Sequence, residues 1–140
     1  MKCLILIAVL LFSLHSAKAC DCLKALTTSE AYERATFVFT GKVLKINPQY
    51  DGTGDSYLNL QVDIAIDTVF KGIRLTGKIS VYTMGSTASC GFPFEEGRSY
   101  LIYSRGGRGE SKVYLCDGSN LKEDAKAQIK ELQQIVEEKK

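Results

Sequence analysis

The sequence has no apolar run long enough to cross a bilayer. Its apolar stretch at residues 4–12 spans nine residues, about half of the roughly 20 that a membrane helix needs. This stretch follows the basic Lys2 and precedes Ala17-Lys18-Ala19, which has the small-x-small pattern of a cleavage site. The order is typical of a secretory signal peptide. We therefore expect residues 1–19 to be removed, residues 20–140 to form one domain, and the mature protein to be secreted. Its location would be extracellular or, in a bacterium, the periplasm or the cell surface.

Histidine is missing from the expected mature chain, because His15, the only histidine in the sequence, lies in the signal peptide. The mature protein then has no histidine general base, no Ser–His or Cys–His pair and no imidazole metal ligand. Many common hydrolase mechanisms are excluded on this ground. We expect a protein that is not an enzyme and that carries no cofactor and no metal of its own.

An excess of charge of one sign is also missing. Loss of Lys2 and Lys18 with the signal peptide lowers the count of Lys and Arg from 18 to 16 (18 − 2), which equals the 16 Asp and Glu residues. A net charge near zero does not favour nucleic acid or an anionic membrane surface as a partner. We expect a monomer whose partner is a protein.

Four cysteines remain after Cys3 leaves with the signal peptide: Cys20, Cys22, Cys90 and Cys116. An even count in an exported chain indicates two disulfides. A Cys20–Cys22 bridge would close a strained ring, and the residues alone leave the other two pairings open. Zinc binding by four thiolates is the alternative, but the C-x-C start and the wide gaps fit a zinc ribbon poorly.

The residue pattern predicts a mainly β domain with a helix near each end. Leu58, Leu60, Val62 and Ile64 alternate with polar residues, which is typical of a half-buried strand. Gly41 indicates a bulge or bend within its strand. A small closed antiparallel barrel of five strands fits this pattern. The expected strands are residues 37–46, 58–66, 78–83, 99–104 and 112–116, with a loop at 47–56 and a hairpin tip at 106–109.

Helices are predicted near both ends of the expected mature chain. Thr27-x-x-Glu30 resembles a capping box for a short helix at residues 29–35. Asn120 is the expected cap of a C-terminal helix. The apolar stripe of that second helix would consist of Leu121, Ala125, Ile129, Leu132 and Ile135.

Three segments could carry chemistry. A free α-amino group and the carbonyl of Cys20 could form a five-membered chelate on zinc, since the amine, with a pKa of about 8, loses its proton easily. Disulfides at Cys20 and Cys22 would hold that chelate rigid, although bridges that merely anchor a terminus are the simpler explanation. Residues 86–91 form a small polar loop around Cys90, for which an ordinary turn between strands is the simpler explanation. Residues 106–109 are rich in glycine but lack the Lys-Ser/Thr ending and the following helix of a phosphate-binding loop, so a hairpin tip is expected there.

The ordered motifs of the chain resemble the netrin-like fold, and especially the N-terminal domain of the tissue inhibitors of metalloproteinases. The resemblance covers nearly the whole expected mature chain and implies an OB-like, closed five-stranded barrel. It also implies the pairs Cys20–Cys90 and Cys22–Cys116. The matching segments are the C-x-C start, Phe39-Thr40-Gly41-Lys42-Val43, Val69-Phe70-Lys71-Gly72, Ser89-Cys90-Gly91, Gly97-x-x-Tyr100-Leu101-Ile102 and Leu115-Cys116.

The resemblance implies a function as well. In that family the N-terminal cysteine binds the catalytic zinc of a metalloproteinase through its amine and carbonyl, and the second residue enters the specificity pocket. Here the second residue is Asp21, where inhibitory members carry Ser or Thr. The positions that would form the inhibitory ridge are Cys20, Asp21, Cys22, Leu23, Ala88, Ser89 and Cys90, with Cys20 as the ligand of the protease zinc.

Two other functions remain open for this sequence. The chain could be a secreted netrin-like interaction module whose partner is not a protease. It could also be a lipoprotein acylated at Cys20, although Ala17 and Lys18 match the residues of a lipobox poorly. Inhibition by zinc chelation requires a free Cys20 amine, whereas neither alternative does.

Overall fold

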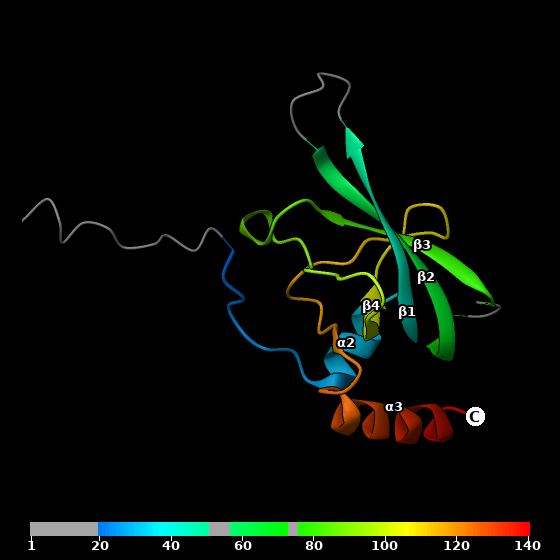
Figure 1. Cartoon of the computed structure of the whole chain (residues 1–140). Coiled ribbons are helices and arrows are strands. Elements are labelled where there is room, and N and C mark those ends of the chain that lie inside the picture. Colours follow the sequence, from blue (N-terminus) through cyan, green and yellow to red (C-terminus); the bar gives the residue numbers. More distant parts are fainter. Residues whose placement is uncertain (1–19, 51–56, 73–75) are drawn as a thin grey trace, which may run out of the picture.

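The chain folds into an antiparallel β-sheet with two α-helices beside it (Figure 1). The computed structural model describes residues 20–50, 57–72 and 76–140, so the expected signal peptide at residues 1–19 lies outside the described residues. Along the chain the elements are α2 (Thr28–Arg34), β1 (Phe37–Tyr50), β2 (Tyr57–Lys71), β3 (Lys78–Met84), the 3-10 turn η1 (Thr87–Ser89), β4 (Ser99–Ser104), β5 (Asn120–Leu121) and α3 (Lys126–Glu138).

The five strands form one sheet in the order β3-β2-β1-β4-β5, with every neighbouring pair antiparallel. The mainly β class with two flanking helices is therefore confirmed. The sheet does not close into a barrel among the described residues, because β3 and β5 stand at its two edges. Isolated bridges join Lys112 to Tyr82 on β3 and to Arg105 directly after β4, which brings the two parts of the sheet close without a continuous strand between them.

The first two strands are longer than the pattern predicts. β1 runs to Tyr50 and β2 from Tyr57 to Lys71, so residues 47–50 belong to a strand and not to the expected loop. Pro48 misled the prediction, because proline lacks the N–H that an interior strand needs. Beyond Lys42, which pairs with Ser99, β1 has lost its β4 neighbour, and Pro48 pairs with β2 only. Proline is tolerated at such an edge position.

Gly41 lies where the pairing between β1 and β2 slips by one residue, as predicted. A Cβ atom at this position would lie 2.5 Å from Cγ2 of Ile64 and 2.7 Å from the carbonyl oxygen of Ala65. The two strands approach so closely here that only glycine fits without a shift of the backbone.

Apolar side chains form a core on each face of the sheet. The first cluster includes Phe39, Val62, Ile64, Val81 and Ile102 and fills one face. The second lies under the helices and consists of Ala31, Tyr32, Ala35, Val38, Phe70, Leu101, Tyr103, Ala125 and Leu132. Consecutive β4 residues alternate between the two clusters, which explains why its sequence, SYLIYS, reads as one nearly unbroken apolar run.

The segment after β4 differs from the prediction in two places. Residues 112–116 are not a strand, since only Arg105 and Lys112 exchange backbone hydrogen bonds at the base of the hairpin, at 2.9 and 2.7 Å. Asn120 does not cap the C-terminal helix, because Asn120 and Leu121 pair with β4 as the short strand β5. The helix begins only at Lys126, after Ala125.

The expected apolar stripe of α3 is otherwise present. Ile129, Leu132 and Ile135 pack in the second cluster, whereas Leu121 packs against the first. The short helix α2 contributes Ala31 and Tyr32 to that second cluster, so α2 and α3 lie together on one side of the sheet (Figure 1).

Candidate functional site

Two disulfides fasten the N-terminal segment to the body of the protein. Cys20 is bonded to Cys90 with 5.3 Å between their Cα atoms, and Cys22 is bonded to Cys116 with 5.6 Å. These are the two pairs that the family resemblance implies, and with them all four thiols of the described chain are taken up. Zinc binding by four free thiolates does not fit this arrangement.

The first anchor, Cys90, ends the 3-10 turn η1. The Ser86 hydroxyl accepts the backbone N–H of Ser89 at 3.3 Å and lies 3.0 Å from the Ser89 hydroxyl, so the turn is tied at its start. Cys90 then adopts the left-handed region with φ of 65°, which is uncommon for a residue other than glycine. This conformation turns the chain back toward the sheet.

Gly91 allows that return. A Cβ atom at Gly91 would lie 2.1 Å from the carbonyl oxygen of Met84 and 2.8 Å from that of Ser86. Because the backbone of the loop closes directly onto this position, no side chain can be placed here without moving the loop that carries Cys90.

The second anchor, Cys116, lies in a turn that a buried carboxylate organises. Asp117 accepts the backbone N–H of Tyr114 at 3.2 Å, and two nitrogens of Arg105 donate to its oxygens at 3.3 and 2.6 Å. The two anchors are also joined to each other, since the Leu115 N–H donates to the Cys90 carbonyl at 2.9 Å. The two segments to which the disulfides attach are therefore hydrogen-bonded to each other.

The far end of the N-terminal segment is held by the cap of α2. The Glu30 carboxylate accepts the backbone N–H of Thr27 at 2.9 Å, and the Thr27 hydroxyl accepts the N–H of Glu30, which completes the predicted capping box. The Thr27 N–H, and next the Lys24 ammonium at 3.2 Å, lower the pKa of Glu30 to about 2. The helix start and the disulfides thus fix the segment at both ends.

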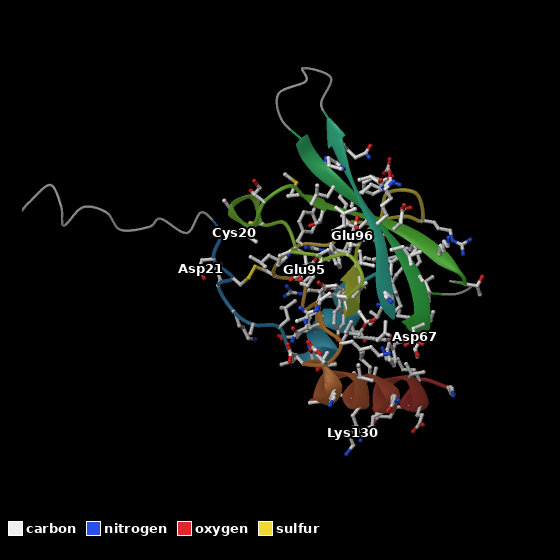
Figure 2. All side chains as sticks on the ribbon, viewed as in Figure 1. Cys20, Asp21, Asp67, Glu95, Glu96 and Lys130 are labelled. Atoms are coloured by element: carbon white, nitrogen blue, oxygen red, sulfur yellow. A yellow bond between two sulfur atoms is a disulfide. The ribbon has the colours of Figure 1, made fainter. Side chains whose placement is uncertain are left out.

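Between these anchors the segment is exposed and makes few contacts of its own. Leu23 is fully exposed, and Asp21 is exposed between the two half-buried cysteines. Within the described chain, no hydrogen bond joins residues 20–23 to the rest of the protein. Their position is therefore set by the two covalent bridges, as seen at the edge of the molecule in Figure 2.

The predicted site residues come together in one place. We call residues 20–23 together with residues 88–90 the N-terminal ridge. The Cys20–Cys90 bond brings the two parts side by side, and Ala88 and Ser89 are exposed like Asp21 and Leu23. The ridge is a narrow, rigidly held projection with one ionisable side chain, that of Asp21.

The sequence did not predict the ion pair that holds the turn at Cys116, to which Cys22 of the ridge is bonded. Asp117 and Arg105 lie 12 positions apart, and no motif connects them. The only local signal was the Cys116-Asp117-Gly118 sequence, a polar turn composition beside a bonded cysteine. The glycine-rich residues 106–109 are exposed at the hairpin tip, where the Gly106 N–H donates to the Thr36 hydroxyl at 3.3 Å.

Residues 20–50, 57–72 and 76–140, which the structure describes, contain no group of three or more His, Cys, Asp or Glu side chains arranged to hold a metal ion. None of their helices is long and apolar enough to cross a membrane. Comparison with models of known protein families and with curated protein sequences finds no match.

Proposed function

We propose that this chain is a secreted inhibitor of zinc metalloproteinases. Cleavage after Ala19 would free the α-amino group of Cys20, and the amine and carbonyl of Cys20 would bind the catalytic zinc of the protease. The observation that carries the proposal is the N-terminal ridge, in which Asp21 and Leu23 are exposed while two disulfides fix the segment at Cys20 and Cys22.

The chemistry of such a terminus suits a catalytic zinc. The amine nitrogen and the carbonyl oxygen of one residue close a five-membered ring on the metal, and a catalytic zinc keeps one coordination position open for water or substrate. The amine must be neutral to bind, and its ordinary pKa of about 8 makes the loss of its proton inexpensive near neutral pH. The chelate would displace the water that the protease needs for hydrolysis.

Rigidity supports the proposal because binding costs less when a group is already in place. A free terminus would lose conformational entropy on entering a cleft, at about 1–2 kcal/mol per residue for the backbone. The bridges at Cys20 and Cys22 have removed most of that freedom before the protease is met. The loop at Ala88 and Ser89 adds a second exposed edge beside Cys20.

The proposal extends to the fold and the location. We propose an OB-like barrel of the netrin-like type that closes between β3 and residues 111–113. Its support is the pair of hydrogen bonds at Tyr82, whose N–H donates to Ser111 at 2.7 Å and whose carbonyl accepts the Val113 N–H at 2.8 Å. Secretion is supported by the two disulfides, which persist in oxidising compartments.

The test compares two recombinant proteins against a panel of zinc endopeptidases. One begins at Cys20, and the other carries one extra alanine before it. The extra residue turns the amine into an amide, which cannot bind zinc, and it would collide with the metal site. We expect inhibition to fall by more than about 100-fold, beyond the loss that changes around a metal ligand usually cause.

An alanine added after Lys140 is the matched control, since it lengthens the chain far from the ridge (Figure 1). Equal inhibition by the native form and the form extended before Cys20 would refute zinc chelation. If the native form inhibits no zinc protease of the panel, the chain is better explained as a netrin-like interaction module. Mass spectrometry of the natural N-terminus would show in addition whether Cys20 is acylated.

A further inference from the structure

Asp21 carries the one charged side chain of the N-terminal ridge. The other ridge residues are Cys, Leu, Ala and Ser, so the carboxylate of Asp21 is the only ionisable side chain there. It is exposed, and its side chain points away from the body of the protein in Figure 2. Within the described chain it has no hydrogen bond and no ion pair.

No cationic side chain of the described residues is paired with this carboxylate. The nearest cationic side chain of the expected mature chain, Lys24, is paired with Glu30 at 3.2 Å, and η1 contains only Thr, Ala and Ser. The Cys20 amine of the proposed chelate is neutral when it binds zinc. The backbone of Asp21 is fixed on both sides, because Cys20 and Cys22 are each in a disulfide. The backbone of Asp21 therefore has little freedom to move when the ridge contacts the surface of a partner.

The place of Asp21 in a complex follows from the zinc chelate, so this inference rests on the proposed function. In a peptide substrate the carbonyl before the cleaved bond binds the zinc, and the side chain of the next residue enters the specificity pocket beyond the metal. If the Cys20 carbonyl takes that place, the Cα of Asp21 lies one residue on, about 3.8 Å along the chain. Asp21 then occupies the position of the residue that follows the cleaved bond.

An apolar pocket would reject this side chain. A carboxylate that leaves water without a partner is strongly disfavoured, and the catalytic carboxylate of the protease would repel it further. An arginine or lysine in the pocket reverses the effect, because a charge-assisted and often bidentate pair replaces the lost water. Leu23, two residues after Asp21, is apolar and fully exposed, so it favours contact with an apolar surface of the protease.

We infer that the partner of this protein is a zinc endopeptidase whose specificity pocket beyond the metal carries a positive charge, and which cleaves before acidic residues. Its cleft presents an apolar surface where Leu23 lies. The ridge thereby imitates a substrate with aspartate directly after the cleaved bond and leucine two residues further.

The experiment measures inhibition constants of the mature protein and of Asp21→Asn and Asp21→Thr. Two zinc endopeptidases are used: one that cleaves before aspartate and one that cleaves before leucine. Against the first we expect both variants to bind at least about 10-fold more weakly, since each removes the charge of a paired group. Against the second we expect Asp21→Thr to bind about 5- to 150-fold more tightly than the unmodified protein.

Asp124→Asn is the matched control, because Asp124 is an exposed aspartate of the loop before α3. The inhibition constants of this variant should equal those of the unmodified protein. Circular dichroism of each variant shows that the fold is retained. The inference on the pocket is wrong if the unmodified protein inhibits the leucine-specific enzyme better than Asp21→Thr does. It is also wrong if Asp21→Asn inhibits the aspartate-specific enzyme as well as the unmodified protein does. In both cases the inhibitory function stands. If no form inhibits either enzyme, both the inference and the proposed function are overturned.

Discussion

Arg105 and Asp117 form a two-point ion pair directly beneath the turn that carries Cys116. Nη2 and Nε of Arg105 donate to the two carboxylate oxygens of Asp117, at 2.6 and 3.3 Å. The Asp117 side chain is nearly buried while that of Arg105 is half exposed. The same carboxylate holds the Tyr114 N–H, so one side chain connects the end of β4 to the anchor of the Cys22 disulfide.

Removal of the Asp117 carboxylate should destabilise the domain. Hydrogen bonds to a charged group contribute about 1.5–3 kcal/mol each, and Asp117→Ala leaves the Tyr114 N–H without its partner. We expect the free energy of unfolding, measured in urea, to fall by about 2–3 kcal/mol. Glu123→Ala is the control, because the Arg98–Glu123 pair is exposed and should cost less than about 1 kcal/mol. Equal losses in the two variants would contradict this account.

A methyl group at Gly91 should damage both stability and inhibition. Its Cβ would lie 2.1 Å from the Met84 carbonyl oxygen, so Gly91→Ala must displace the loop that ends at Cys90. We expect a loss of about 1–3 kcal/mol in the free energy of unfolding, typical of overpacking, and weaker inhibition. Gly107→Ala has open space around its Cβ and should change stability by less than about 0.5 kcal/mol. Thermal unfolding of both variants decides the matter.

The capping box predicts a pH dependence of stability. The Thr27 N–H and Lys24 lower the pKa of Glu30 from 4.5 to about 2 in the folded protein. A lowered folded-state pKa contributes stability that is present above pH 4.5 and is lost as the pH falls toward 2. Glu30→Gln keeps the shape of the side chain but lacks this charge. The unmodified protein should therefore exceed Glu30→Gln in stability at pH 7, and the difference should shrink between pH 4.5 and pH 2.

Urea titrations of both proteins at several pH values within that range would measure the difference. Glu138→Gln, an exposed residue at the end of α3, serves as the control and should show no comparable trend. A gap between the unmodified protein and Glu30→Gln that stays constant down to pH 2 would mean that the charge of Glu30 does not stabilise the helix.

Loss of a disulfide should cost more than any of these changes. Cys22–Cys116 spans 94 residues, for which the chain-entropy model gives about 4–5 kcal/mol. The double variant Cys22→Ser with Cys116→Ser should therefore unfold at a markedly lower urea concentration. It should also inhibit more weakly, since only the Cys20–Cys90 bond then holds residues 20–23, and no hydrogen bond within the described chain joins them to the body. A thiol titration of the unfolded, unreduced parent protein should find no free thiol. Two reactive thiols per chain would contradict the pairing.

Local chemistry in the sequence was enough to predict several features. Thr27 and Glu30 are three residues apart, and a capping box depends on no more than that spacing. The break in pairing at Gly41 and the β4 segment likewise follow from residue type and short-range pattern. The prediction that residues 88–90 lie beside the N-terminal segment depended on a Cys20–Cys90 bond, which the family resemblance implies and the structure contains.

Other features were decided only by contacts between distant parts of the chain. Asn120 is a good helix cap by residue type, yet its segment pairs with β4, because Leu121 packs on the sheet core. The residues alone left two disulfide pairings open, since the choice depends on which cysteines the folded sheet brings within reach. The ion pair of Arg105 and Asp117 and the exposure of Asp21 are of the same kind. Each results from packing across the fold, where tertiary contacts outweigh local preference.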